Sequence, residues 1–184
     1  MSSPDGAVPG PRVLLVGLMA TGKSTLGRAI SERTGWPAYD NDELLQAKTG
    51  STPAELLASS GEQAMRAAES DVLAHTLRLP APLVAGVAAG TVLDPVNRRR
   101  LQDGGHVVWL RTPVATLVTR VTGDNHRPFL SEDPARALQE MADVRHPLYA
   151  EVAHQELDMD ALSVQEAAAL VIEAVAGSTT RGSR

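Results

Sequence analysis

The sequence contains no cysteine, and this absence excludes both disulfide bridges and metal centres built on thiolates. No apolar run approaches the ~20 residues of a membrane span, and the first residues lack the basic and then apolar pattern of a signal peptide. Internal repeats and low-complexity segments are also missing. We therefore expect a cytoplasmic protein without a membrane partner, in which one domain buries a sizeable core.

Lysine is nearly missing as well. Of the 17 basic residues only Lys23 and Lys48 are lysine, and the others are arginine. The formal net charge is −5, which argues against a general nucleic-acid-binding protein and predicts no nucleic-acid partner. Because the chain avoids lysine almost everywhere but keeps Lys23, we expect this position to require the compact point charge of an ammonium group.

Lys23 belongs to a glycine-rich motif. Residues 17–24 read Gly-Leu-Met-Ala-Thr-Gly-Lys-Ser, an apolar run at 13–16 precedes them, and a helical pattern follows. A strand, G-x-x-x-x-G-K-[ST] and a helix in this order are typical of the phosphate-binding P-loop, whose backbone N–H groups and helix N-terminus point at an anion. Lys23 would bridge the β- and γ-phosphates of ATP, and the Ser24 hydroxyl would ligate Mg²⁺. Four fixed positions disfavour the alternative, a turn that only caps a helix. The predicted nucleotide-binding residues of the motif are Gly17, Ala20, Thr21, Gly22, Lys23, Ser24 and Thr25.

The rest of the chain alternates between strand and helix patterns. Because no two strands are joined by a hairpin signal, this alternation predicts a parallel sheet with helices on both faces, a three-layer α/β/α fold. Gly35 is placed to end the helix expected at 23–34, and Thr52-Pro53-Ala54-Glu55 reads as a helix-starting capping box. The five expected strands are residues 12–17, 36–39, 83–87, 106–110 and 156–159.

The pattern also predicts how the domain is bounded. Residues 12–176 form the expected kinase domain, preceded by a flexible Ser-, Pro- and Gly-rich lead at 1–11 and followed by a disordered tail at 177–184. Residues 41–78, between the second and third strands, form a small substrate-binding insertion. A polar, proline-containing segment at about 122–134 has no periodicity, and we expect it to be a mobile lid. An insertion this short indicates a small-molecule acceptor rather than a macromolecular one.

Two carboxylates follow the second strand, in Asp40-Asn41-Asp42. The carboxyl edge of an open parallel sheet is where ligands bind, so these side chains should lie next to the P-loop. One of them could face the Mg²⁺ ion and the other a substrate hydroxyl, as acceptor or base. The alternative is a turn in which the aspartates only cap the backbone.

Four arginines are candidate ligands, although each could be an ordinary surface charge. Arg127 lies in the expected lid, from which a guanidinium could stabilise charge on the transferring phosphoryl group. Arg66 lies three residues before Glu69, so the carboxylate can brace the guanidinium on one helix face. The other two are Arg120 and Arg145.

Taken together, these residues resemble the shikimate kinase family, within the nucleoside monophosphate kinase-like P-loop proteins, from about residue 13 to residue 175. The family's Asp-x-Asp is matched by residues 40–42, and its Gly-Glu-x-x-Phe-Arg-x-x-Glu helix by Gly-Glu-Gln-Ala-Met-Arg-Ala-Ala-Glu at 61–69. Asn-His-Arg-Pro-Phe-Leu at 125–130 is similar to the lid's Arg-Pro-Leu stretch, and Arg145 to Tyr149 is similar to its Arg-x-x-x-Tyr helix end. The resemblance implies a five-stranded sheet, a moving lid and transfer of the ATP γ-phosphate to a ring hydroxyl of shikimate.

The resemblance also implies roles for individual residues. On the acceptor side, Asp42 would contact the hydroxyl, Arg66 and Arg145 would hold a carboxylate, and Glu69 would position Arg66. On the nucleotide side, Asp40 would act with Ser24 on Mg²⁺, Arg127 would reach the phosphates and the acceptor, and Arg120 would lie on the adenine face. The resulting catalytic set is Lys23, Asp42 and Arg127, and the acceptor-binding set is Asp42, Arg66, Glu69, Ala88, Ala89, Gly90 and Arg145.

Three departures from the family pattern concern the two ends of this site. Ala88-Ala89-Gly90 stands where the family has three glycines, and we expect the two methyl groups to narrow the acceptor pocket and to be strained if either residue has a positive φ. Met65 replaces a phenylalanine beside Arg66 and softens one pocket wall. Ala20 replaces a P-loop glycine at a variable position, where we expect it to be tolerated.

Three functions are therefore compatible with the sequence. The first is phosphoryl transfer from MgATP to a hydroxyl of shikimate or a similar carboxylated polyol, by a monomer with a small-molecule partner. The second is a diverged kinase for another cyclitol, a sugar acid or a hydroxy amino acid. The third is a nucleotide-binding module without turnover, which the joint presence of Lys23, Asp40, Asp42 and Arg127 disfavours.

Overall fold

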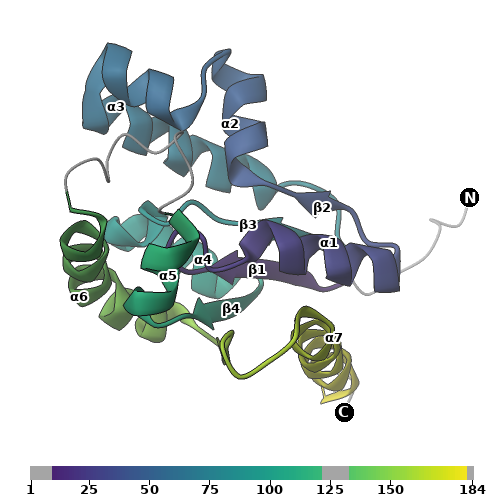
Figure 1. The fold of residues 1–184 in the computed structure, drawn as a ribbon. Helices are drawn as coiled ribbons and strands as arrows, with labels where there is room; N and C mark the ends of the chain where they lie inside the picture. The colour runs from purple at the N-terminus through teal and green to yellow at the C-terminus, as the bar shows by residue number, and fades with distance from the viewer. Residues whose placement is uncertain (1–9, 122–132, 182–184) are drawn as a thin grey trace, which may run out of the picture.

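The strands form one parallel five-stranded sheet in the order β2-β3-β1-β4-β5 (Figure 1). The structure is a computed structural model, and it describes residues 10–121 and 133–181. The strands are β1 (Arg12–Val16), β2 (Ala38–Tyr39), β3 (Leu83–Gly86), β4 (His106–Arg111) and β5 (Gln155–Asp158). The helices are α1 (Lys23–Thr34), α2 (Asn41–Thr49), α3 (Pro53–Thr76), the 3-10 turn η1 (Thr91–Leu93), α4 (Pro95–Gly104), α5 (Val114–Val121), α6 (Pro134–Val152) and α7 (Val164–Arg181).

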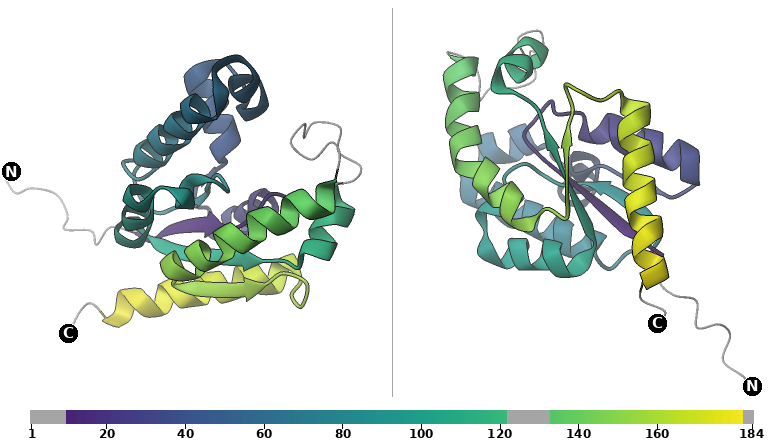
Figure 2. Two further views of the ribbon diagram at one scale, coloured as in Figure 1. Left: turned by 90° about the vertical axis from the view of Figure 1, so that its left-hand side faces the viewer. Right: turned by 90° about the horizontal axis from the view of Figure 1, so that it is seen from below.

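The central strand β1 is fully buried because both of its faces are covered by helices. Val13 and Leu15 point to one face and Leu14 and Val16 to the other, as the two-residue period of a strand requires. The first pair packs against α1 and α7, and the second pair packs into a core that includes residues of α3, α4, α5 and α6. Figure 2 shows the sheet between these two helical layers. The three-layer α/β/α architecture expected from the sequence is confirmed.

The helix boundaries follow the capping residues seen in the sequence. Gly35 ends α1 in the left-handed conformation, with φ 74°, as expected for a glycine at this position. The capping box before α3 is also confirmed. The Thr52 N–H donates to Glu55 Oε2 at 2.8 Å, and the Glu55 N–H donates to Thr52 Oγ1 at 3.2 Å.

Helix α3 consists of two helical segments that meet at Gly61, whose φ of 80° and ψ of 173° are not helical. One boundary differs from the sequence-based expectation. Helix α7 continues to Arg181, so a disordered tail beginning at Gly177 is wrong for 177–181. A glycine inside a helix costs about 1 kcal/mol relative to alanine, which weakens the helix without ending it.

The site is positioned by the carboxyl edge of the sheet. The P-loop follows β1, Asp40 follows β2, and residues 88–90 follow β3, so all three meet at one edge. Helix α2 packs on α3, and together they form the insertion that stands beside this edge in Figure 1. Residues 1–9 of the expected lead and 122–132 of the expected lid lie outside the described residues.

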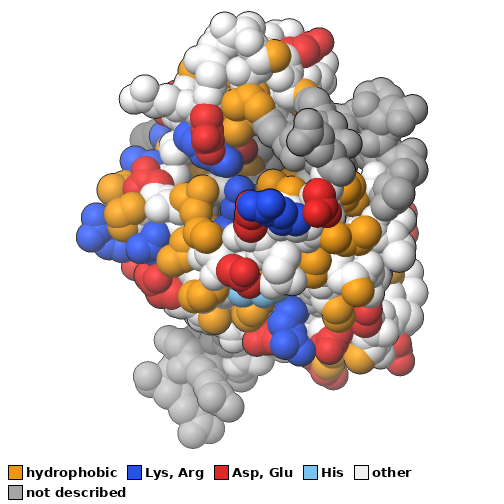
Figure 3. Space-filling model, turned by 60° about the vertical axis from the view of Figure 1, so that its left-hand side comes forward, with side chains coloured by type: hydrophobic (Ala, Val, Ile, Leu, Met, Phe, Trp, Pro, Cys, Tyr) orange, Lys and Arg blue, Asp and Glu red, His pale blue; other side chains and the backbone are white. Residues whose placement is uncertain are grey.

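The surface carries both signs of charge. On the face drawn in Figure 3, acidic side chains lie next to basic ones, with hydrophobic side chains between them. Among the helices of the described part of the chain, none combines the length and apolar character needed to cross a membrane.

Candidate active site

The P-loop is shaped by residues with left-handed or otherwise positive φ. Gly17 has φ 147°, and a side chain there would meet the Leu110 carbonyl oxygen at 2.7 Å. Gly22 has φ 97° and forms the N-cap of α1. The Thr21 hydroxyl is buried and donates to the Leu18 carbonyl at 2.9 Å, which closes the loop on itself. These contacts leave the backbone curled around the N-terminus of α1, as phosphate binding requires.

Lys23 extends across the mouth of this loop. Its Nζ donates to the carbonyl oxygens of Gly17 at 2.9 Å and of Leu18 at 2.8 Å. Both acceptors belong to the loop itself, so the ammonium group is held at the place where phosphate oxygens would enter. This position fits the predicted role of Lys23 as the cation for the β- and γ-phosphates.

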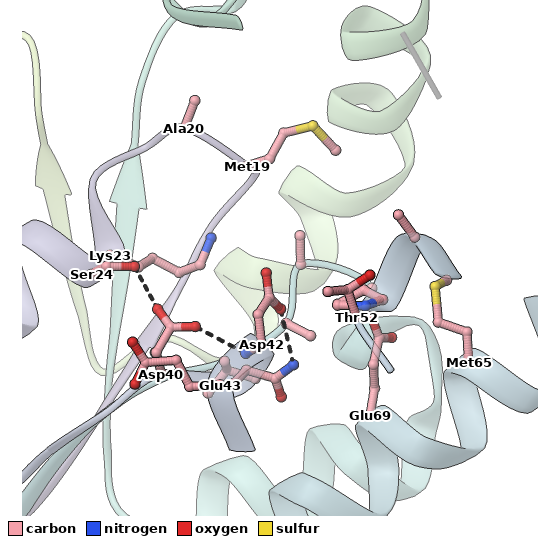
Figure 4. Close-up of a pocket in the computed structure, with 18 of the residues that line it drawn as sticks. Met19, Ala20, Lys23, Ser24, Asp40, Asp42, Glu43, Thr52, Met65 and Glu69 are labelled. Atoms are coloured by element: carbon pink, nitrogen blue, oxygen red, sulfur yellow. Dashed lines mark hydrogen bonds between the residues drawn. The ribbon is translucent and has the colours of Figure 1, made fainter. Parts of the chain in front are cut away.

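Ser24 and Asp40 lie together on the other side of the loop. The Ser24 hydroxyl donates to Asp40 Oδ2 at 2.5 Å, and Asp40 Oδ1 accepts the backbone N–H of Asp42 at 2.9 Å (Figure 4). Asp40 therefore caps α2 with one oxygen and holds the Ser24 hydroxyl with the other. A hydroxyl and a carboxylate oxygen side by side are hard ligands of the kind Mg²⁺ prefers.

The rest of the described chain fits a cation held in this way. In the described part of the chain, no group of three or more His, Asp or Glu side chains is arranged so that it could hold a metal ion. Mg²⁺ in kinases commonly takes only one or two protein ligands and completes its shell with phosphates and water, so a small donor set is sufficient.

Asp42 points away from Asp40. It lies in the first turn of α2, exposed to the cavity, between Lys23 on one side and Glu69 on the other (Figure 4). The Asn41 side chain donates to its Oδ1 at 3.4 Å. The two carboxylates of the motif thus face different partners, and both also support the start of α2. The alternative of a purely capping role applies to Asp40 only in part and not to Asp42.

A single cavity of about 770 Å³ joins the P-loop to the insertion. Its walls include Lys23, Ser24, Asp40 and Asp42 at one end and Arg66 at the other. Of the predicted nucleotide residues, Ala20, Gly22, Lys23, Ser24 and Thr25 line this cavity, whereas Gly17, Thr21 and Arg120 do not. Glu69, Ala88, Ala89, Gly90 and Arg145 also line this cavity.

Arg66 is held by two carboxylates of its own helix. Its Nη1 donates to Glu69 Oε2 at 2.8 Å and its Nη2 to Glu62 Oε1 at 3.1 Å. Burial alone lowers the pKa of Arg66, but Glu69 and Glu62 outweigh it and raise that pKa. Burial raises the pKa of Glu69, and Arg66 opposes this effect. The predicted bracing of Arg66 by Glu69 is confirmed, and Glu62 adds a second contact at i,i−4.

Arg145 approaches the same region from α6. Burial lowers its pKa, and the neighbouring Arg66 lowers it further, while Tyr149 and Glu69 act in the opposite direction. Tyr149 is fully buried, and burial raises its pKa. Two guanidinium groups that face one cavity with limited solvation offer N–H donors suited to a carboxylate.

Gly90 completes this end of the cavity. A Cβ atom at position 90 would overlap the guanidinium of Arg66, so a side chain there would have to displace that group. Among the described non-glycine residues, positive φ is found at Ala20, and Ala88 and Ala89 do not share it. The expected strain at positions 88 and 89 is therefore absent, and their effect on the acceptor is limited to their methyl groups on the cavity wall.

Ala20 carries the strain instead. Its φ is 61°, in the left-handed region that costs roughly 1 kcal/mol or more for a residue with a Cβ atom. The P-loop accepts this alanine, as expected. Its carbonyl oxygen receives a hydrogen bond at 3.1 Å from Nη1 of Arg120, which places Arg120 beside the loop. Arg127 lies outside the described residues.

Some site residues could not be singled out from the sequence. Met19 of the P-loop and Met141 of α6 line the cavity with Met65, and these three flexible thioethers form soft walls. Thr52, known from the sequence only as a helix cap, lines it as well. Glu62 could have been found from its spacing to Arg66. The two methionines carry no comparable signal, because both look like ordinary apolar positions.

Comparison with known proteins agrees with this geometry. A family model described as shikimate kinase matches residues 19–176. The chain is 36% identical to a shikimate kinase of Symbiobacterium thermophilum over 173 residues, which are 92% of this chain and 99% of that protein. It is 39% identical to one from Xanthomonas oryzae pv. oryzae over 165 residues, 89% of this chain and 91% of that protein.

A solved structure is similar over the same region. Shikimate kinase from Acinetobacter baumannii, in complex with shikimate, superimposes with a TM-score of 0.86 at 32% identity, covering 92% of this chain and 94% of that one. The family model spans residues 19–24 of the P-loop, the insertion and helix α6, which contribute residues to the cavity. The chain belongs to the shikimate kinase family of P-loop phosphotransferases.

Proposed function

We propose that this protein transfers the γ-phosphate of ATP to a hydroxyl group of shikimate. The observation that carries this proposal is the single cavity that joins Lys23 and Asp42 to the half-buried pair Arg66 and Arg145. One end suits a polyphosphate and the other suits a carboxylate, and the exposed Asp42 carboxylate lies between them. Shikimate has both a carboxylate and ring hydroxyls, and a relative with the same fold binds it.

The phosphate end acts by position and charge. The loop backbone and the N-terminus of α1 would hold the β-phosphate, and Lys23 would neutralise charge that spreads toward the bridging oxygen. Ser24 and Asp40 would hold Mg²⁺, which supplies charge stabilisation on the phosphate oxygens when it is bound. Arg120 supports the loop from α5 through the Ala20 carbonyl. We propose Mg²⁺ on the basis of the Ser24–Asp40 pair and the family's use of ATP.

The acceptor end orients the nucleophile. Arg66, braced by Glu69 and Glu62, and Arg145 would hold the acceptor carboxylate, so that a ring hydroxyl faces Asp42. Asp42 would accept the hydroxyl proton as the oxygen attacks the γ-phosphorus. The new P–O bond forms as the bond to the β–γ bridging oxygen breaks, and ADP leaves. Arg127 would add positive charge from the segment 122–132.

A different acceptor is the second candidate. Met65, Ala88 and Ala89 differ from the family pattern, and all three line the acceptor end of the cavity. Another carboxylated cyclitol, a sugar acid or a hydroxy amino acid would use the same arginine pair. A module without turnover is disfavoured, since Lys23, Ser24 and Asp42 line one cavity.

The experiment is an ATP-consumption assay with shikimate against a panel of polyols, sugar acids and hydroxy acids. We expect turnover with shikimate to exceed turnover with every other acceptor. Robust turnover only on another acceptor would favour the diverged kinase, and tight ATP binding without turnover would favour the non-catalytic module. Lys23→Ala should abolish most turnover, whereas Lys48→Ala, at an exposed ion pair with Asp71, should leave it unchanged.

We also propose that the enzyme acts as a cytoplasmic monomer. A single cavity holds the donor and acceptor residues of the described chain, so a second copy is not required for the site. Size-exclusion chromatography with light scattering should give a mass near the 19.4 kDa of the chain. A stable dimer under assay conditions would contradict the monomer.

A further inference from the structure

The turn that closes the acceptor site is short, and its own residues do little to stabilise its conformation. Residues 88–90 lead directly into η1, which is only one 3-10 turn, with Thr91 N–H donating to the Ala88 carbonyl at 3.0 Å and Leu93 N–H to the Gly90 carbonyl at 3.0 Å. Isolated 3-10 turns are marginal because their hydrogen-bond geometry is poor. Tertiary contacts must therefore hold this turn, and with it Gly90, against Arg66.

Close packing does not supply those contacts on the α3 side. A second cavity of about 360 Å³ lies behind the acceptor site, and Arg66, Gly90, Thr91 and Asn97 are among its walls. Since open space adjoins the turn here, the turn could shift without a steric barrier on this side. On the other side Val92 is fully buried in the apolar core, and polar contacts from other elements fix the position of the turn further.

The first such contact comes from α6. The hydroxyl of Tyr149 donates to the carbonyl oxygen of Ala89 at 2.7 Å. Tyr149 is fully buried and lies one helical turn after Arg145, so this bond ties the middle of the turn to the helix that carries the second acceptor arginine.

The second contact comes from Arg98 of α4. Its Nη1 donates to the carbonyl oxygens of Val92 at 2.9 Å and Leu93 at 3.4 Å, which are the last carbonyls of η1 and lack a partner within it. Its Nε donates to Oε1 of Glu151, in the last turn of α6, at 2.9 Å. The Arg98 side chain is only 18% exposed. One guanidinium thus bridges the end of the turn and the end of α6.

Helix α4 is further fixed on both sides of Arg98. The Asn97 side chain is buried and donates to the hydroxyl of Ser70, which follows Glu69 on α3, at 2.7 Å. The Gln102 side chain donates to the carbonyl oxygen of Glu151 at 2.9 Å. Helix α4 therefore contacts three of the elements that carry acceptor residues: α3, the turn and α6.

We propose that Arg98 is a positioning residue of the acceptor site. By joining η1 to α6, Arg98 sets the distance between Gly90 and Arg66 on one side and Arg145 on the other. The proposal rests on the proposed function, because it assigns these arginines to the acceptor. Arg98 does not touch the main cavity, so it acts through the turn and through α6. Loss of Arg98 weakens acceptor binding and leaves the P-loop, on the far side of the cavity, intact.

The test is a set of kinetic measurements on Arg98→Ala, with Arg99→Ala as the matched control. Arg99 is the next residue of the same helix and is exposed. We expect Arg98→Ala to raise the KM for shikimate by about tenfold, because a charge-assisted bridge is lost. The KM for ATP should stay within about twofold of the wild-type value. Arg98→Lys should give an intermediate value, since one ammonium cannot reach both Glu151 and the η1 carbonyls as the guanidinium does.

A second control separates positioning from loss of stability. Val171→Ala removes buried volume from the opposite face of the sheet, against α1, and lowers the melting temperature without touching the acceptor side. We expect it to leave the shikimate KM unchanged at temperatures below its transition. An unchanged shikimate KM in Arg98→Ala, or an equal rise in Val171→Ala, would overturn the positioning role.

Hydrogen exchange keeps this test independent of the substrate assignment. In Arg98→Ala, the amides of Thr91 and Leu93 should exchange at least about tenfold faster than in Arg99→Ala, because η1 has lost its anchor. Failure of the wild-type enzyme to phosphorylate shikimate would count against the proposed function alone. Unchanged exchange at these two amides would count against the role of Arg98 alone.

Discussion

Gly90 lies so close to Arg66 that a single added carbon would occupy the place of its guanidinium. The two residues come from different elements, one from the turn after β3 and the other from α3. The missing side chain at position 90 is therefore what allows Arg66 to face the cavity while it remains bonded to Glu69 and Glu62. The acceptor site depends on this contact more than on any feature of the P-loop.

Gly90→Ala tests that dependence. The φ of −88° at Gly90 is accessible to alanine, so the backbone needs no change and the methyl group must displace the Arg66 side chain. We predict that the KM for shikimate rises by at least about tenfold, while the dissociation constant of ATP is unchanged. Gly177→Ala is the control, since nothing lies within 4 Å of a Cβ there. An acceptor KM equal in both variants would contradict the account.

The buried Glu69 carboxylate gives acceptor binding a pH dependence. Burial raises the pKa of Glu69 above 4.5, against the opposing effect of Arg66. As the pH falls through this raised pKa, Glu69 takes up a proton and ceases to brace Arg66 as an ion. We predict that kcat/KM for shikimate falls on the acid side at a pH above 4.5, and that Glu69→Gln removes this limb. A limb that persists in Glu69→Gln would assign it to another group.

Ala20→Gly should stabilise the protein. Ala20 has φ 61°, which glycine adopts without the clash of a Cβ atom. We predict a gain of about 0.5 to 1 kcal/mol in the free energy of unfolding, measured by urea denaturation. Ala54→Gly, in the first turn of α3, should lower the same quantity. Loss of stability in both variants would mean that the left-handed conformation at position 20 carries no strain.

His146 makes stability depend on pH. Burial, and then the charge of Arg111, lower its pKa below 6.5, and its ring lies 5.4 Å from that of Trp109. The folded state thus favours the neutral ring. As the pH falls, His146 takes up a proton in the unfolded chain at a higher pH than in the folded protein. The contribution of the neutral ring to the free energy of unfolding is therefore complete above pH 6.5 and is lost as the pH falls toward the lowered pKa of the folded state.

An NMR titration of the His146 ring provides the measurement. We predict a pKa below 6.5 in the wild-type protein and a higher pKa in Arg111→Ala, because one of the lowering charges is removed. A wild-type pKa at or above 6.5 would show that the ring is better solvated than its packing on Trp109 indicates.

Local chemistry made much of this structure predictable. The P-loop, the glycine that ends α1 and the capping box before α3 are each defined by a few adjacent residues, and all three occur as expected. Alternating strand and helix patterns were enough for a parallel sheet, because parallel strands need helical crossovers. The pair Arg66 and Glu69 was readable for the same reason, since three residues separate its members on one helix.

Contacts between distant segments were not predictable. The overlap between position 90 and Arg66 depends on where α3 crosses the turn, and no spacing in the sequence reports that crossing. Arg98 stands among three consecutive arginines, and nothing in that run distinguishes the bridging residue from its exposed neighbour. The concern about strain at Ala88 and Ala89 was likewise misplaced, because φ values follow from the whole turn and not from its composition.

The central claim is that the carboxylate of Asp42 serves the transfer of phosphate to shikimate. The most direct measurement is detection of the product by phosphorus NMR, after incubation of ATP, Mg²⁺ and shikimate with the wild-type protein or with Asp42→Asn. Asp143→Asn, at an exposed position of α6, is the control. We predict phosphorylated shikimate with the wild type and with Asp143→Asn, and a rate at least about 100-fold lower with Asp42→Asn. Phosphorylated shikimate at near-wild-type rate from Asp42→Asn, or none from the wild type, would contradict the account.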